Sequence, residues 1–147
     1  VIADTEINAA SIMLELTETS LMSQLDSTKV ILEKLTALGI SIAIDDFGIG
    51  YTSLAHLKHL PINLLKIDQS FVGRINIDKQ DAAIVTAIIA MAQSLGLRVI
   101  AEGVETRDQL SFLSKQGCYA IQGYICCPPV PADQIPCYLE RTNLLET

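Results

Sequence analysis

Polar side chains that can bind metal ions or move protons end five short hydrophobic stretches of this chain. The stretches read IMLE, IAIDD, LLKID, VIAE and AIQ. Because side chains alternate between the two faces of a β-strand, each stretch places polar groups on one face and mostly Ile, Leu, Val or Ala on the other. The polar residues of matching parity are Glu15, Asp45, Lys66, Asp68, Glu102 and Gln122. We therefore predict a sheet with one face packed under helices and polar groups gathered where the strands end.

A cluster of carboxylates at such an edge needs positive charge nearby, because like charges repel and burial raises the pKa of a carboxyl group. The set is rich in oxygen ligands and contains no His or Cys, which favours Mg²⁺, Mn²⁺ or Ca²⁺ over zinc or copper. The adjacent acids Asp45 and Asp46 could hold or bridge two ions about 3.5–4 Å apart, an arrangement used for in-line displacement at phosphorus. A lysine among the acids can orient or polarise the attacking water. The chemistry alone therefore favours two-metal phosphodiester hydrolysis.

Each of these residues also has a purely structural explanation. The acids could be solvated charges at strand ends or caps of turns, and Lys66 could form a surface ion pair with Asp68. Five separate strand ends with matching parity favour a functional site over chance.

Gly and Pro residues divide the chain into alternating predicted strands and helices. The predicted strands cover residues 12–15, 41–46, 64–68, 98–102 and 118–123. Three predicted helices cover residues 28–38, 81–95 and 132–140. A short helix is predicted through Leu54 and Leu57 and ends before Pro61. Another helix is predicted to begin at the capping box of Thr106 and Gln109 and to end at Gly117. The first of these helices places Ile31, Leu35 and Leu38 at helical spacing.

Strands that alternate with helices imply one α/β unit whose parallel strands are joined by right-handed crossovers. Both open doubly wound sheets and (β/α)8 barrels carry their functional residues at the C-terminal ends of the strands. The pattern therefore predicts one compact domain, or part of one, with its site at that edge.

Composition excludes several classes of protein. Half of the residues are hydrophobic, 18% are charged and the formal net charge is -7, so the chain should repel a nucleic-acid polymer, and a phosphate ligand would need help from a metal ion. The longest apolar run, residues 82–92, is shorter than the ~20 residues that a membrane-spanning helix needs. The N-terminal residues do not resemble a secretory signal and do not begin with Met, so we expect a piece of a longer cytoplasmic protein, which could be tethered to a membrane through other domains.

The four cysteines and two histidines do not have the spacing of a metal site. Cys118, Cys126, Cys127 and Cys137 include an adjacent pair and two isolated members, whereas zinc ligands usually come in pairs two to four residues apart. We expect small buried thiols in a reducing compartment. The two histidines, at positions 56 and 59, are expected on a solvated helical face.

Five longer motifs resemble the EAL domain family. The motifs are LELTETS (residues 14–20), DDFGIGYTSL (45–54), LLKIDQSFV (64–72), VIAEGVET (99–106) and QGY (122–124), and they span nearly the whole chain. The resemblance implies a cyclic di-GMP-specific phosphodiesterase with a (β/α)8-type barrel that contains one antiparallel strand. It also implies Mg²⁺ or Mn²⁺ as cofactor, Ca²⁺ as inhibitor, and linear pGpG as product.

The resemblance assigns roles to the residues at the strand ends. It implies that Glu15 and Asp45 ligate the first metal ion and that Asp46 ligates the second. It implies that Lys66 positions the hydrolytic water and that Glu102 is the base or a ligand that acts through water. It implies that Asp68 lies beside the second metal ion and that Gln122 holds a water molecule bound to the metal.

The same resemblance implies a loop that couples the site to a dimer contact. Glu18 and Glu105 resemble acids that hold the loop of residues 46–54, and the loop positions that match are Phe47, Gly48 and Gly50. Departures from the family pattern are Ile49, Thr52, Cys126, Cys127 and Pro128, of which Pro128 replaces a basic residue that could contact phosphate.

Length indicates an incomplete barrel. A barrel of this type needs ~250 residues, whereas the chain has 147, and the family's Glu-x-Leu motif, a substrate-binding Arg and a metal-ligating Asn are absent. We therefore expect residues 1–147 to be the C-terminal portion of one EAL domain, with about five βα units, and a homodimer or larger assembly to cover the open side. The parent protein is expected to hydrolyse cyclic di-GMP, and the isolated chain is expected to be inactive. The alternative is a non-catalytic EAL-like module that binds cyclic di-GMP or has a regulatory role.

Overall fold

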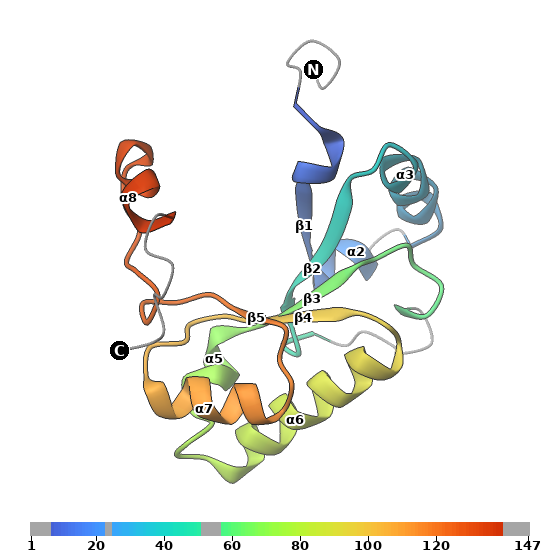
Figure 1. Ribbon diagram of the computed structural model, residues 1–147. Helices are drawn as coiled ribbons and strands as arrows, with labels where there is room; N and C mark the ends of the chain where they lie inside the picture. Colours follow the sequence, from blue (N-terminus) through green and yellow to red (C-terminus); the bar gives the residue numbers. More distant parts are fainter. Residues whose placement is uncertain (1–6, 23–24, 51–56, 140–147) are drawn as a thin grey trace.

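A single parallel sheet forms the centre of the computed structural model, which describes residues 7–22, 25–50 and 57–139 (Figure 1). The sheet has five strands in the order β1-β2-β3-β4-β5. Their bounds are β1 (Met13–Thr17), β2 (Ser41–Phe47), β3 (Leu64–Ile67), β4 (Arg98–Ala101) and β5 (Ala120–Ile121). A doubly wound sheet reverses its strand order at a switch point, and this sheet does not. The order therefore fits successive units of a barrel wall rather than an open doubly wound sheet.

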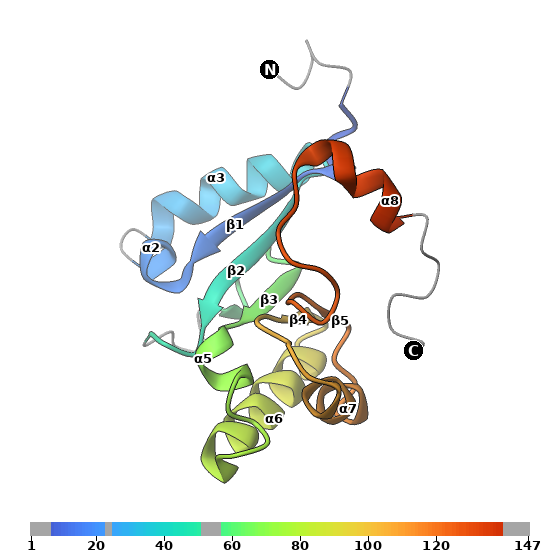
Figure 2. The ribbon, with the colours of Figure 1, turned by 90° about the vertical axis from the view of Figure 1, so that its left-hand side faces the viewer.

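Most of the helices lie between consecutive strands, whereas η1 precedes β1, and η2 and α8 follow β5. Their bounds are η1 (Ala9–Ser11), α2 (Glu18–Met22), α3 (Leu25–Ala37), α5 (Gln69–Val72), α6 (Lys79–Ser94), α7 (Arg107–Lys115), η2 (Ala132–Gln134) and α8 (Ile135–Leu139). Right-handed crossovers in one direction place successive helices on the same side of a sheet. Figures 1 and 2 show α3, α6 and α7 around the outer side of the curved sheet, whereas α8 stands apart from α6 and α7 in both views.

The two faces of the sheet differ as the alternation of side chains predicts. Four residues of β2 and β3 are fully buried and belong to the core cluster that includes residues of α6 and α7. They are Ile42, Ile44, Leu65 and Ile67, each 0% exposed. The neighbouring positions of opposite parity in β2 and β3, which include Lys66, face the other side. The predicted parity is confirmed, and the polar groups lie on the face away from the helices.

The boundaries of several elements differ from the prediction. Helix α6 begins at Lys79 because the Asp78 carboxylate caps it, accepting a hydrogen bond from the Gln80 N–H at 2.8 Å. Strand β5 has two residues rather than six, and the short helices α2 and α5 were not predicted. The predicted helix through Leu54 lies mostly outside the described residues, and Leu57 is buried.

The predicted stripe of α3 is partly correct. Leu35 packs against the core, whereas Ile31 and Leu38 are 56% and 63% exposed. Leu32, which was not in the predicted stripe, is 2% exposed and packs in the core.

The cysteines are less buried than predicted. Cys118, Cys126 and Cys127 are half-buried, and Cys137 is exposed, so the expectation of buried thiols is wrong for Cys137. All four are free thiols. His59 is exposed, as expected of a solvated face, and His56 lies outside the described residues. Among the described residues, every helix is too short or too polar to cross a membrane.

A leucine pair tests the location of the core. Leu65→Ala should lower the free energy of unfolding by about 2–5 kcal/mol, because it leaves a cavity in the central strand, where Leu65 is 0% exposed. The matched control Leu38→Ala should change this free energy by less than about 0.5 kcal/mol, because Leu38 is on the surface. Urea titration followed by circular dichroism measures both, and equal losses would contradict the assigned core.

Candidate active site

The strand pairing continues for one residue beyond the ends of β4 and β5, and it fixes two functional positions. The Glu102 N–H donates to the Ile67 carbonyl at 3.1 Å, and the Gln122 N–H donates to the Ala101 carbonyl at 2.8 Å. The backbone of each residue is therefore held at the C-terminal edge of the sheet, where β1, β2 and β3 also end.

Lys66 in β3 binds three carboxylates from three other strands. Its Nζ lies 2.7 Å from Glu15 Oε2, 3.0 Å from Asp45 Oδ1 and 2.6 Å from Glu102 Oε1. The Lys66 side chain is only 5% exposed. Burial favours the neutral amine, but the hydrogen bonds to Glu102, Glu15 and Asp45 outweigh it, so the pKa of Lys66 is raised above its ordinary value. The site therefore contains an ammonium group that its three carboxylate partners stabilise in the charged form.

A β-bulge places both aspartates of β2 at the site. Ile44 pairs with Leu65 and Phe47 pairs with Ile67, so Asp45 and Asp46 together lie opposite Lys66. Asp46 has a left-handed backbone, with φ of 54°, a conformation that Asp adopts more readily than most residues. The Asp46 N–H donates to Asp45 Oδ1 at 3.1 Å. In a regular strand the two side chains would point to opposite faces, so strand parity alone missed the position of Asp46.

Three carboxylates come close enough to share a cation. One oxygen each of Asp45, Asp46 and Glu102 lies within 4.8 Å of the others, and all three residues are half-buried. Opposite ligands of an octahedral ion at about 2.1 Å stand about 4.2 Å apart, so this spacing fits a divalent ion with oxygen ligands. Burial raises the pKa of Asp46, and the charges of Asp45 and Asp68 raise it further against the opposing effect of Lys66. The cluster thus carries more negative charge than Lys66 alone compensates.

The other predicted ligands lie around this cluster rather than in it. Glu15 reaches it through Lys66, and its side chain is 44% exposed. Asp68 is 8% exposed, and its Oδ1 caps α5 by accepting a hydrogen bond from the Ser70 N–H at 2.8 Å. Gln122 is exposed and lines the adjoining pocket.

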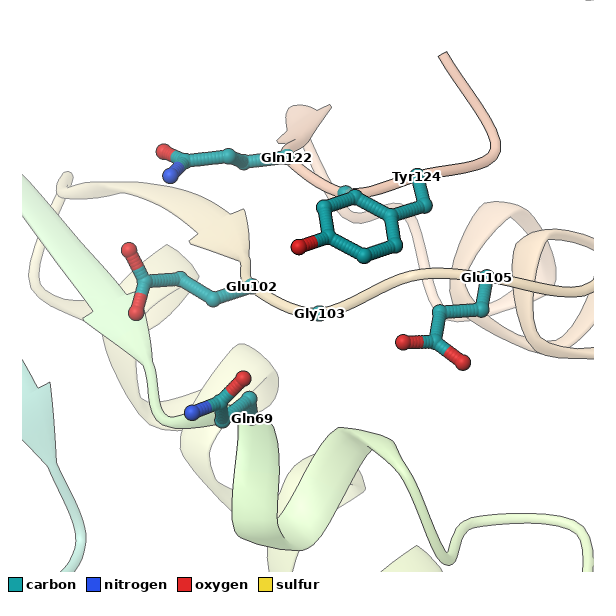
Figure 3. Close-up of a pocket in the computed structure, with 7 residues that line it drawn as sticks. Gln69, Glu102, Gly103, Glu105, Gln122 and Tyr124 are labelled. Atoms are coloured by element: carbon teal, nitrogen blue, oxygen red, sulfur yellow. The ribbon is translucent and has the colours of Figure 1, made fainter. Parts of the chain in front are cut away.

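That pocket has a volume of about 350 Å³ and opens beside Glu102. Figure 3 shows the side chains of Gln69, Glu102 and Gln122 projecting in the same direction. Three residues for which no role was predicted also line the pocket: Gln69, Gly103 and Tyr124. A Cβ atom on Gly103, where φ is +67°, would lie 2.6 Å from the Cβ of Gln69, so the glycine permits the loop after β4 to approach α5 this closely.

The loop after β2 is held by Glu18 at the start of α2. Glu18 is 3% exposed, and its Oε2 accepts hydrogen bonds from the N–H groups of Gly48 and Gly50, each at 3.2 Å. A Cβ atom on Gly50 would lie 2.6 Å from Glu18 Oε1, so a larger residue there would displace the Glu18 carboxylate. Phe47 is buried in the core beneath this loop.

Glu105 takes a different position from Glu18. It is exposed, and it lines the pocket with Glu102 and Gln122. Pro128 lines a neighbouring pocket that shares Gln122 and Tyr124 with the first. The predicted role of Glu105 in holding the loop stays a prediction.

The EAL domain family model matches residues 1–129 of the chain. The chain belongs to the EAL domain family. The bifunctional diguanylate cyclase/cyclic di-GMP phosphodiesterase MucR of Pseudomonas aeruginosa is 46% identical over 129 residues, which are 88% of this chain and 19% of MucR. The cyclic di-GMP phosphodiesterase NbdA of the same organism is 50% identical over 123 residues, which are 84% of this chain and 16% of NbdA. The chain thus spans less than a fifth of either EAL protein.

Solved EAL structures share the fold. The MucR phosphodiesterase in complex with cyclic di-GMP superposes with a TM-score of 0.88 at 45% identity, covering 91% of this chain and 54% of the MucR chain. Klebsiella pneumoniae BlrP1, solved with cyclic di-GMP and manganese or calcium, superposes with a TM-score of 0.77 at 32% identity, covering 84% of this chain and 31% of BlrP1. The predicted family and its α/β fold are therefore confirmed.

The bulge can be tested with two substitutions at Asp46. Asp46→Gly should keep the stability of the protein, because glycine adopts a left-handed backbone without cost. Asp46→Val should lower the free energy of unfolding by about 1–3 kcal/mol, because a β-branched residue is strained there. Urea titration compares the two variants, and equal stabilities would show that the left-handed backbone is not the constraint.

The carboxylate of Glu18 can be tested separately. Glu18→Ala should lower the free energy of unfolding by about 1.5–3 kcal/mol, because the N–H groups of Gly48 and Gly50 lose their hydrogen bonds to a charged acceptor. Amide hydrogen exchange at Gly48 and Gly50 should accelerate in the same variant. Glu33→Ala is the control, since that side chain is 54% exposed; unchanged exchange in Glu18→Ala would contradict the assigned contact.

Proposed function

We propose that the protein carrying this chain hydrolyses cyclic di-GMP to linear pGpG with Mg²⁺ or Mn²⁺. The observation that carries the proposal is the group of Asp45, Asp46 and Glu102, whose oxygens lie within 4.8 Å of one another beside Lys66. The names of MucR and NbdA, and the cyclic di-GMP in the MucR structure, support the substrate. The manganese in a BlrP1 complex supports the metal.

The residues divide between holding the cation and handling protons. Asp45 and Asp46 would hold a divalent ion, Glu102 would contact it through a water, and Glu15 and Asp68 would be further acids at its edge. When bound, such an ion neutralises charge on the phosphate and makes water a stronger nucleophile. With a formal net charge of -7, the protein needs this compensation to bind an anionic dinucleotide.

Glu102 and Lys66 would carry the proton chemistry. The Glu102 carboxylate can take a proton from the attacking water, whose oxygen bonds to phosphorus while one phosphodiester P–O bond breaks and the leaving oxygen takes a proton from solvent. Lys66, 2.6 Å from Glu102 Oε1, keeps that carboxylate oriented and can donate a hydrogen bond to the water. The Gln122 amide lines the pocket on the other side of Glu102 and can hold a water or a phosphate oxygen.

The chain alone does not hold a complete site in this proposal. It corresponds to 54% of the solved MucR chain, and we propose that it is the C-terminal portion of one EAL domain. Met13 and Leu14 of the edge strand β1 are each 38% exposed, which favours a covering segment or a second copy over a free edge. We therefore expect a homodimer or larger assembly of the whole protein, and no turnover by the isolated chain.

A substitution of Glu102 tests the proposal. In the full-length protein, Glu102→Gln should abolish the formation of pGpG from cyclic di-GMP with Mn²⁺, because an amide cannot take the proton. The dissociation constant for cyclic di-GMP, measured by calorimetry with Ca²⁺, should stay within about threefold. Chromatography follows the product, and Glu33→Gln is a control at an exposed glutamate.

The outcomes separate the candidate functions. Unchanged turnover in Glu102→Gln would remove Glu102 from the mechanism. A wild-type protein that binds cyclic di-GMP without cleaving it would establish the non-catalytic binding module instead. Turnover by the isolated chain would contradict its proposed inactivity.

A further inference from the structure

The Lys66 ammonium binds two of the three carboxylates that come together at the proposed metal site, those of Asp45 and Glu102. We infer that Lys66 is a resident counter-ion that competes with the divalent ion and thereby sets the affinity of the site for metal. The inference rests on the proposed function for the identity of the ion, and on the geometry of this chain for the competition.

Carboxylates occupy all the hydrogen-bond donors of the Lys66 ammonium in this structure. A lysine ammonium has three N–H donors, and Lys66 has three carboxylate partners at 2.6, 2.7 and 3.0 Å. Its side chain is 5% exposed, so water cannot replace these partners. An ammonium buried to this extent requires compensating charge. The contacts are therefore strong, and any process that weakens them has a substantial cost.

The partners of Lys66 overlap with the residues that approach one another as a cation site. Asp45 and Glu102 bind the ammonium, and together with Asp46 they place three oxygens within 4.8 Å. A divalent ion among these oxygens would bind, directly or through water, two carboxylates that already neutralise Lys66. It would also lie close to the positive charge of the Lys66 ammonium. Since like charges in a partly desolvated site repel, the two cations oppose each other.

Such opposition is reciprocal. If the ammonium lowers the affinity for the ion, the ion must weaken the hold of the carboxylates on Lys66 by the same factor. In the metal-free protein Lys66 would keep the acids together and prevent their mutual repulsion from opening the sheet edge. In the metal-bound protein Lys66 would be partly released, which frees an N–H donor for water or phosphate.

A neutral residue at position 66 tests the competition without any nucleotide. Lys66→Met in the full-length protein should bind Mn²⁺ at least fivefold more tightly than the wild type, the lower end of ordinary coupling between two sites. The melting temperature of its metal-free form should fall, and the rise in melting temperature on adding Mn²⁺ should be larger than in the wild type. Calorimetric titration and thermal unfolding measure the two effects.

Three further variants control the measurement. Lys66→Arg keeps the charge and should show no gain in Mn²⁺ affinity. Lys29→Met removes an exposed lysine, whose side chain is 41% accessible, and should match the wild type. Lys66→Gln is also neutral but can hydrogen-bond, and it replaces Lys66→Met if that variant does not fold.

The results distinguish the inference from the proposed function. Equal or weaker Mn²⁺ binding by the neutral variants would overturn the competition and make Lys66 a residue that merely orders the ligands. If the wild type does not bind Mn²⁺ but a neutral variant does, the inference stands and the proposed metal dependence of the native site fails. If neither binds, both fail.

Discussion

Burial of a positive charge among the strands is the constraint on which the arrangement of this site depends. The side chain of Lys66 lies in the central strand β3 and is 5% exposed. It is tolerated because β1, β2 and β4 each supply a carboxylate: Glu15, Asp45 and Glu102. A shift of one residue in the register of β3 would turn the ammonium toward the helices and leave the acids unpaired. Charge pairing on one face and hydrophobic packing on the other therefore specify the same register.

The bulge in β2 solves a geometric problem that a regular strand cannot solve. Two adjacent aspartates on opposite faces would bury one carboxylate under the helices, where it would have no partner. The extra residue and the left-handed backbone of Asp46, with φ of 54°, bring both acids to the polar face. The local strain lies where the proposed function requires the carboxylates, and strained backbones are commonly found at functional sites.

Periodic and strongly hydrophobic elements could be predicted from the sequence, because their cause is local. The strands β2 to β4 and the long helix α6 have continuous patterns, and the parity of Lys66 and Glu102 follows from them. The bulge at Asp46 depends on how β2 pairs with β3, and Gln69 enters the pocket through the close approach of Gly103. Neither contact is encoded in a pattern of neighbouring residues.

The solvent-facing parts of the fold show the same limit. In α3 the exposed Ile31 and the buried Leu32 are almost equally hydrophobic, so only the docking line of the helix on the sheet decides which is buried. Short helices such as α2 and α5 lack enough turns to show a period, and their formation depends on contacts with the sheet. The capping residue Asp68 of α5 could be found only as an acid at a strand end, a description that fits a cap and a ligand equally well.

The position of Glu18 extends the charge constraint from the sheet to the loop. The end of β2 carries the acids at positions 45 and 46, and the loop that follows carries the N–H groups of Gly48 and Gly50 that Glu18 binds. Glu18 follows β1 directly, so the loop of one strand is fixed to the end of its neighbour. Asp46 lies at the bulge of β2, next to this loop, whereas Lys66 is held by strands on both sides. Of the three clustered carboxylates, that of Asp46 is therefore nearest along the chain to the loop that Glu18 binds.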